Sequence, residues 1–468
     1  MDHLNGLPLP APAVVPVLDP HFRPAVLAVR AYQARVREAG GGIPVRLALE
    51  QADGSVFRFD LAVLPPEHPE AAGNVAYVER YVKFLLWSRG GWRLLVDGPA
   101  DLVSALDAHY RDTATGRFDA DLVASKMFDN PMAVVRTTDL PAGRSVTKPL
   151  GRHLDGCRIG FDLGGSDRKV AAVIDGEVVF SEETVWDPYH KPDPQYHFDG
   201  IMDSLQKAAE HLPRVDAIGG SAAGVYVNNR VKAGSLFRGV PQDLFDARVK
   251  DLFLEVRRAW KDVPLDVVND GEVTALAGSM SLGKNAILGI ALGTSTAAGY
   301  VTPDGNITSW LNELAFVPVA YNPDAPADEW SGDFGVGSQY LSQQAVGRLA
   351  PRAGIETPAD LGLPEKLKVV QRLRADGHAG ARQVYDTIGT YLGYAVAHFA
   401  DFYDIAHVLV LGRVTSGPGG DDIIDGARRV LDVEFPELAS RITFHVPDEK
   451  DKRHGQAIAA ASLPEVAR

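Results

Sequence analysis

The feature that most constrains this chain is a series of short apolar runs that each end in a glycine or an acidic turn. Longer stretches with helical periodicity separate these runs, and such alternation predicts an α/β core with ligand sites at the ends of its strands. The four runs that matter most cover residues 158–165, 265–270, 287–296 and 407–413. At 468 residues the chain exceeds the usual single core, so we expect two or three domains.

The first 150 residues follow a different pattern. Residues 45–50 and 56–64 flank an Asp-Gly turn and predict one β-hairpin, and residues 81–87 and 92–98 predict a second. Helical periodicity follows at 101–110 and 119–128. We therefore expect an N-terminal α+β module over residues 1–150. Its role cannot be assigned from sequence, because it contains no recognisable catalytic motif.

Charge and cysteine content exclude several classes of protein. The net charge of −14 argues against a broad nucleic-acid-binding surface. The single cysteine, Cys157, excludes an internal disulfide and any zinc site that needs two thiolates from this chain. The start lacks the pattern of a secretory signal, and the most apolar stretch, residues 286–301, falls short of the roughly 20 residues of a membrane helix. We expect a cytoplasmic protein without nucleic-acid or membrane partners.

Three of the strand ends have the composition of phosphate-binding turns. They are residues 162–166, 292–296 and 411–417. Glycine lets the backbone approach a phosphate closely, and nearby N–H groups and hydroxyls donate hydrogen bonds to its oxygens. Asp162, at the end of the first strand, could hold the magnesium ion of a nucleotide directly or through water. Each turn alone could equally be only a turn.

An Asn-Asp pair ends the strand that lies between the first two turns. A carboxylate at this place, Asp270, can accept a proton from a hydroxyl, while the amide of Asn269 orients the substrate. The alternative is that the pair only caps the following helix, since both residue types are favoured there.

The order of these four segments resembles the ROK (repressor, ORF, kinase) family of actin-like sugar kinases. Residues 162–175 read DLGGSDRKVAAVID, residues 267–278 read VVNDGEVTALAG, and residues 293–305 read GTSTAAGYVTPDG. The resemblance covers residues 158–462. It implies a two-lobed ribonuclease H-like core, with lobe 1 over residues 151–285 and lobe 2 over residues 286–468.

The resemblance also implies an activity: ATP-dependent phosphorylation of a sugar hydroxyl, hexose to hexose 6-phosphate, as in a glucokinase. Asp270 would be the general base, and Asp162 would hold the Mg²⁺ that accompanies ATP. The sugar would contact Asn269, Gly224, Glu313 and Ser338. The nucleotide would contact Asp162, Gly164, Gly165, Ser166, Lys169, Gly293, Thr294, Ser295 and Gly412. Relatives are commonly homodimers, which we also expect here.

Departures from the family pattern are concentrated in the substrate lobe. Phe316 stands where the family has a zinc-binding histidine, and residues 332–338 lack its cysteines, so we expect no zinc and a substrate segment held by other packing. Ser338 falls at the second sugar-contacting glutamate by spacing. Arg413 replaces a glycine beside the adenosine, where it can narrow the pocket. Asp167 adds an acid beside the phosphates, which is tolerable if solvated and unfavourable if it points inward.

Several alternatives stay open from sequence. Trp310 could stack on a sugar or pack in the core, and residues 187–194 could be a plain connector or a loop at the cleft. The basic residues within 366–374 most simply form a solvated helix face. The donor could be polyphosphate instead of ATP. The chain could also be a catalytically inactive, sugar-responsive regulator or scaffold, although the strand-rich N-terminal module does not resemble a DNA-binding domain.

Overall fold

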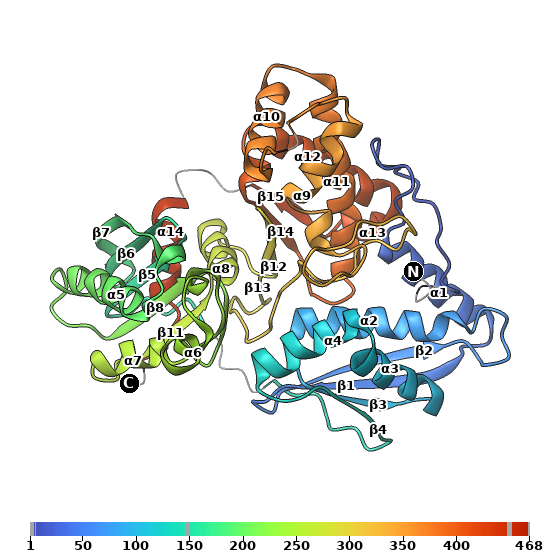
Figure 1. Ribbon diagram of the computed structural model, residues 1–468, viewed down its shortest axis with the longest axis horizontal. Coiled ribbons are helices and arrows are strands. Elements are labelled where there is room, and N and C mark those ends of the chain that lie inside the picture. Colours follow the sequence, from blue (N-terminus) through green and yellow to red (C-terminus); the bar gives the residue numbers. More distant parts are fainter. Residues whose placement is uncertain (1–3, 5, 146–149, 359, 447–451, 467–468) are drawn as a thin grey trace.

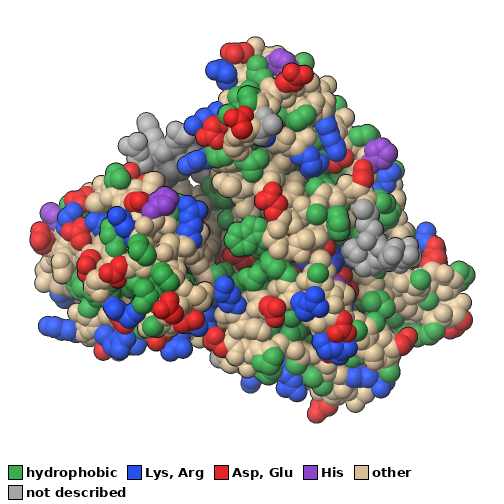
Figure 2. Space-filling view, in the orientation of Figure 1, with side chains coloured by type: hydrophobic (Ala, Val, Ile, Leu, Met, Phe, Trp, Pro, Cys, Tyr) green, Lys and Arg blue, Asp and Glu red, His purple; other side chains and the backbone are tan. Residues whose placement is uncertain are grey.

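The computed structural model describes residues 4, 6–145, 150–358, 360–446 and 452–466. Figure 1 shows the N-terminal module lying beneath lobe 2, with lobe 1 at the side. Among the described residues on the face shown in Figure 2, basic and acidic side chains are interspersed, and the surface is hollowed where lobe 1 meets the rest of the molecule. In the described part of the chain, no helix combines the length and the apolar character that crossing a membrane requires.

The N-terminal module is built on a four-stranded sheet in the order β2-β1-β3-β4. The first predicted hairpin is confirmed, since β1 and β2 pair antiparallel from Ile43 opposite Val63 to Glu50 opposite Val56. The predicted helices are also confirmed, and the second passes into a π-helical stretch. The elements are α1 (Ala25–Glu38), β1 (Ile43–Glu50), β2 (Val56–Val63), α2 (Gly73–Arg89), β3 (Arg93–Asp97), α3 (Ala100–Asp112), α4 (Ala114–Asp119), the π-helix Ala120–Met127 and β4 (Ala133–Arg136).

The second predicted hairpin is wrong in its first strand. Residues 81–87 belong to the helix α2, and only residues 93–97 form a strand, β3. The helix is buried on almost every side because it is enclosed between its own sheet and lobe 2, and its four consecutive apolar residues, Phe84 to Trp87, are fully buried. A short apolar run of this kind has no periodicity that separates a buried helix from a buried strand.

Lobe 1 contains a five-stranded sheet in the order β11-β8-β5-β6-β7. β5, β8 and β11 run parallel, so their carboxyl ends lie at one edge, while β6 and β7 complete an antiparallel meander. The elements are β5 (Cys157–Leu163), β6 (Asp167–Ile174), β7 (Glu177–Val185), the 3₁₀ turn Pro188–His190, α5 (Pro194–Ala209), β8 (Ala217–Ala222), β9 (Val225–Val227), β10 (Arg230–Ala233), the 3₁₀ turn Ser235–Phe237, α6 (Gln242–Leu244), the π-helix Phe245–Val249, α7 (Leu252–Ala259), β11 (Leu265–Asn269) and α8 (Asp270–Leu282).

Lobe 2 contains a four-stranded sheet in the order β13-β12-β14-β15, in which β12, β14 and β15 are parallel. The helix α11 packs along α12. The last helix returns to lobe 1 and packs on β5, β8 and α8. The elements are β12 (Ile287–Leu292), β13 (Thr296–Val301), the 3₁₀ turn Gly337–Gln339, α9 (Gln343–Arg352), α10 (Leu363–Ala375), α11 (Ala379–Phe399), β14 (His407–Leu411), the 3₁₀ turn Arg413–Thr415, α12 (Pro418–Glu434), α13 (Pro436–Ala439), β15 (Thr443–His445) and α14 (Lys452–Ala461).

Candidate active site

The parallel strands of lobe 1 bring Asp162, Ser221 and Asn269 to one sheet edge. Asp162 is opposite Ser221, and Asn269 is opposite the next residue of the same strand, Ala222. Asp162 is 7% exposed, and its Oδ1 accepts a 2.6 Å hydrogen bond from the Ser221 hydroxyl. Burial raises the pKa of Asp162, because the carboxylate has lost most of its water.

The first glycine turn joins β5 to β6 and is fixed by lobe 1 itself. The Gly164 N–H donates to the Asp167 carbonyl over 2.9 Å, and Trp186 Nε1 donates to the Gly164 carbonyl over 2.7 Å. The Asp167 side chain accepts a 2.8 Å hydrogen bond from the Ser166 hydroxyl and lies 3.2 Å from Lys169 Nζ. The charge of Lys169 therefore balances that of Asp167 in this turn.

The connection over residues 187–194 reaches the first glycine turn. Tyr189 lies against Gly165 so closely that a Cβ there would overlap the tyrosine hydroxyl. The other side of Tyr189 is covered by the Arg238 guanidinium, whose carbon lies 3.9 Å from the ring centre. The segment therefore reaches a residue that we predict to contact phosphate, and a role at the cleft stays a prediction.

Asp270 begins α8 directly after β11, as the pattern of strand and small-residue helix predicts. Asn269 caps this helix: its Oδ1 accepts the Gly271 N–H over 2.7 Å, and its Nδ2 donates to the Gly224 carbonyl over 2.7 Å. Burial, with the Asp162 carboxylate second, raises the pKa of Asp270 to about 6. Asn269 therefore caps the helix, and Asp270 remains partly exposed.

Two glycines let α8 pack directly on lobe 2. A Cβ on Gly271 would meet the Ala298 carbonyl, and a Cβ on Gly299 would meet the Gly271 carbonyl. The start of α8 is therefore pressed against β13. This contact places Asp270 where the two lobes meet.

The second and third glycine turns lie together at one edge of the lobe 2 sheet. Gly293 follows β12, and Thr294 and Ser295 after it are exposed. Gly412 follows the parallel strand β14 with φ +95°, and a Cβ there would overlap the Leu292 carbonyl. Arg413 is exposed, and its carbonyl accepts a 2.8 Å hydrogen bond from Gln371.

A cavity of about 610 Å³ lies beside this meeting point, and three parts of the chain line it. Lobe 1 contributes Gly224 and Asn269, and lobe 2 contributes Glu313. Three of the four residues predicted to contact a sugar therefore face one cavity. The further lining residues include Gln51, Ala52, Asp53 and Phe128 of the N-terminal module, Tyr226, Asn228, Arg257 and Glu272 of lobe 1, and Thr308 to Leu311 of lobe 2.

Two carboxyl groups face this cavity, that of the buried Glu272 and that of the half-buried Glu313. Burial, with the Asp270 carboxylate second, raises the pKa of Glu313 to about 7. Burial also raises the pKa of Glu272 to about 8, and the Glu313 carboxylate contributes. Glu272 accepts hydrogen bonds from Asn312 Nδ2 over 2.5 Å and from the Tyr300 N–H over 3.2 Å. The cavity thus offers acceptor oxygens on two sides.

Trp310 lines the cavity and also packs against neighbouring side chains. It stacks on Tyr300 with ring centres 5.4 Å apart, and the Arg89 guanidinium carbon lies 3.7 Å from its ring. Arg89 is the last residue of α2, so the N-terminal module supports this wall. Trp310 thus packs against other side chains and borders the cavity, and its stacking on a sugar stays a prediction.

Ser338 lies apart from the other predicted sugar contacts. It is buried, its hydroxyl donates to Asp328 over 3.0 Å, and it is not among the residues that line the cavity. Phe316, at the position of the family's histidine, packs on Trp87 with ring centres 4.3 Å apart.

Sequence reasoning missed two features of this site. Glu272 was not singled out, although its place two residues after Asp270 could have suggested it. Residues 51–53 and 128 form one wall of the cavity, and no sequence pattern predicts this, because nothing local to those residues marks a long-range contact.

Comparison with known proteins agrees with this architecture. No family model matches the chain. A curated glucokinase from Halalkalibacterium halodurans (strain C-125) is 26% identical over 309 residues, which cover 62% of this chain and 89% of that protein. The solved structure of a ROK hexokinase from Thermus thermophilus aligns with a TM-score of 0.52 at 18% identity, over 65% of this chain and 96% of that one. The two-lobed core has the ROK fold.

The ROK fold is shared by proteins of different function. The structure of a ROK family transcriptional regulator, a homolog of the E. coli MLC protein, also aligns with a TM-score of 0.52 at 18% identity, over 66% of this chain and 79% of that one. The predicted actin-like α/β class is confirmed. The fold alone does not decide between an enzyme and a regulator.

Proposed function

We propose that this chain is an ATP-dependent sugar kinase that converts a hexose to a hexose 6-phosphate, with Asp270 as general base. The observation that carries the proposal is the place of Asp270. It directly follows Asn269, which lines the cavity with Glu313, at the start of α8 where lobe 1 packs on lobe 2, and its carboxylate interacts with that of Asp162 at the end of β5. The pKa of Asp270, raised by burial to about 6, suits a base that works near neutral pH.

In the proposed reaction the sugar lies in the cavity, with Asn269 and Glu313 accepting or donating hydrogen bonds to its hydroxyls. Asp270 takes the proton of the reacting hydroxyl, whose oxygen forms a bond to the γ-phosphorus of ATP. The bond from that phosphorus to the β–γ bridging oxygen breaks, and ADP leaves. Positioning and charge stabilisation supply most of the catalysis in such transfers.

The nucleotide would lie across the glycine turns. Gly164, Gly165 and Ser166 of lobe 1 would contact one side of the phosphates, and Gly293, Thr294 and Ser295 the other, with Lys169 nearby and Gly412 against the adenosine. Asp162 suits the Mg²⁺ that accompanies ATP, because it offers hard oxygen ligands and because its own burial and its nearness to Asp270 leave negative charge to be balanced.

One observation favours the inactive alternative. Tyr189 lies on Gly165, so a phosphate can reach the first glycine turn there only if the tyrosine moves. A sugar-responsive regulator that keeps this tyrosine in place would bind sugar in the cavity without turnover.

A coupled ADP-release assay over neutral hexoses, N-acetylhexosamines and hexuronates tests the proposal, with polyphosphate as a second donor. Saturable, donor-dependent turnover that Asp270→Asn abolishes supports the kinase. Sugar binding in a thermal-shift assay without turnover by either donor supports the regulator. The expected homodimer is checked separately by light scattering.

A further inference from the structure

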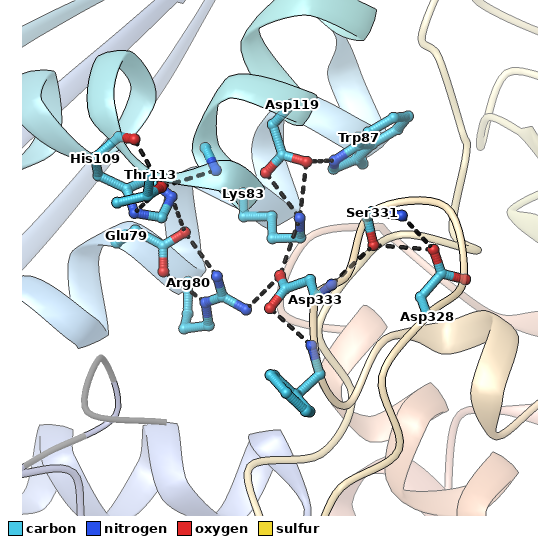
Figure 3. Close-up of polar contacts among 12 residues, drawn as sticks. Glu79, Arg80, Lys83, Trp87, His109, Thr113, Asp119, Asp328, Ser331 and Asp333 are labelled. Atoms are coloured by element: carbon cyan, nitrogen blue, oxygen red, sulfur yellow. Dashed lines mark hydrogen bonds and ion pairs between the residues drawn. The ribbon is translucent and has the colours of Figure 1, made fainter.

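A buried cluster of charged side chains joins α2 of the N-terminal module to a loop of lobe 2 (Figure 3). Lys83 Nζ donates to both oxygens of Asp119, over 2.8 and 2.7 Å, and lies 3.1 Å from Asp333 Oδ2. Arg80 Nη1 donates to Asp333 Oδ2 over 2.8 Å. The side chains of Lys83, Asp119 and Asp333 have no exposed surface.

The charged side chains of the cluster are paired with opposite charges, because an unpaired charge would be very unfavourable at this depth. Arg80 also binds Glu79 through two nitrogens, over 2.6 and 2.9 Å, and His109 Nε2 lies 3.2 Å from Glu79. Burial alone would raise the pKa of Asp333, yet Arg80 and Lys83 overcome this effect and hold it well below the usual range. Removing one partner of such a group leaves an uncompensated buried charge, so the contact between α2 and the loop is strongly specified.

Asp333 begins a segment that pairs with the chain following Glu313. The Ser338 N–H donates to the Ala315 carbonyl over 2.9 Å, and the Gly337 N–H donates to the Val317 carbonyl over 3.0 Å. In return the Val319 N–H donates to the Gly335 carbonyl over 2.8 Å. Holding Asp333 therefore also holds residues 315–319.

The end of α2 binds the segment that carries Glu313 itself. The last carbonyls of a helix have no partner within the helix. Here the Trp87, Ser88 and Arg89 carbonyls accept the backbone N–H groups of Glu313, Asn312 and Leu311, over 2.9, 3.0 and 3.3 Å. Trp87 adds a side-chain contact, since its ring packs on Phe316 and its Nε1 donates to Asp119 over 2.9 Å.

We propose that α2 is a positioning element of the sugar site, in which Arg80 and Lys83 act through Asp333 to hold Glu313 at the cavity. The N-terminal module is then an obligate part of substrate binding and not an independent appendage. The inference rests on the proposed function for its kinetic consequence, but its structural part, the clamping of residues 311–320, does not.

The test is Asp333→Asn, which keeps the side-chain size and removes the charge that Arg80 and Lys83 share. Two quantities are measured on the full chain: amide hydrogen exchange over residues 311–320 without ligand, and KM for sugar and for ATP. We expect exchange at least tenfold faster, a sugar KM at least tenfold higher, and an ATP KM within twofold of wild type.

Asp422→Asn is the matched control, because Asp422 is a buried carboxylate paired with Arg374 between two other helices of lobe 2. It should leave exchange over residues 311–320 and the sugar KM within twofold. Arg80→Lys keeps a cation and should raise the sugar KM less than Asp333→Asn does. If Asp333→Asn does not fold, Arg80→Lys decides in its place, with a threefold to tenfold rise expected.

The proposal is overturned if folded Asp333→Asn keeps wild-type exchange and sugar KM, or if both substrates' KM values rise together. A wild-type chain without turnover would refute the kinase proposal alone, because hydrogen exchange over residues 311–320 still reports whether α2 holds the segment.

Discussion

Glu272 gives a prediction that is independent of catalysis. The residue is 5% exposed and forms no ion pair with any cation in the described part of the chain, so burial raises its pKa from an ordinary 4.5 to about 8. Between these two values the folded chain holds a proton that the unfolded chain has released, so stability falls as pH rises through this window. Well inside this window each pH unit costs about 1.4 kcal/mol. Because the dependence flattens as the pH approaches the folded-state pKa, the total loss between pH 6 and pH 8 is about 2 kcal/mol.

Glu272→Gln removes this titration and keeps one acceptor oxygen, which can serve either Asn312 Nδ2 or the Tyr300 N–H. The lost hydrogen bond lowers the stability of the variant at both pH values and does not change its pH dependence. The assay is thermal unfolding of wild type and variant at pH 6 and pH 8. About 2 kcal/mol corresponds to a wild-type Tm that falls roughly 2–4 °C more than that of the variant over this interval, because a chain of 468 residues has a large entropy of unfolding. Equal falls in Tm for the two proteins would show that Glu272 does not titrate in this window, and would refute the account of its burial.

Two further predictions concern the proposed chemistry. Because the pKa of Asp270 is about 6 and the base must be ionised, kcat/KM should fall about tenfold per pH unit below pH 6; a rate that stays flat down to pH 4.5 would contradict the assignment. Gly165→Ala should raise the ATP KM at least fivefold and leave the sugar KM unchanged, because its Cβ would overlap Tyr189. Gly165→Ala combined with Tyr189→Ala should recover part of the loss, and a double variant no better than the single one would exclude this steric cause.

Strand-end chemistry is the part of the site that sequence predicts best. Asp162, Asn269 and Gly412 each follow an apolar run, and parallel pairing brings such ends together whatever the helices between them do. The same local signals predict the hairpins of β1 with β2 and of β6 with β7.

Long-range packing accounts for what sequence did not predict. Lobe 2 covers α2, so the helix is buried on almost every side although it carries charged residues. Its last carbonyls accept the N–H groups of Leu311–Glu313, and no side-chain pattern encodes such backbone contacts. Glu272 is an acid in the first turn of a helix. Such an acid ordinarily lies at the surface, where it interacts favourably with the helix dipole. The burial of Glu272 depends on Asn312 and Tyr300, which come later in the chain.

The measurement that tests the central claim most directly is ADP release by wild type and by Asp270→Asn, with each sugar of the panel and with ATP. If Asp270 is the general base of a sugar kinase, the wild type should show saturable, sugar-dependent release, and kcat should fall at least a thousandfold in a variant that still binds sugar. Turnover that survives in Asp270→Asn, or a wild type that binds sugar and ATP without releasing ADP, would contradict this proposal.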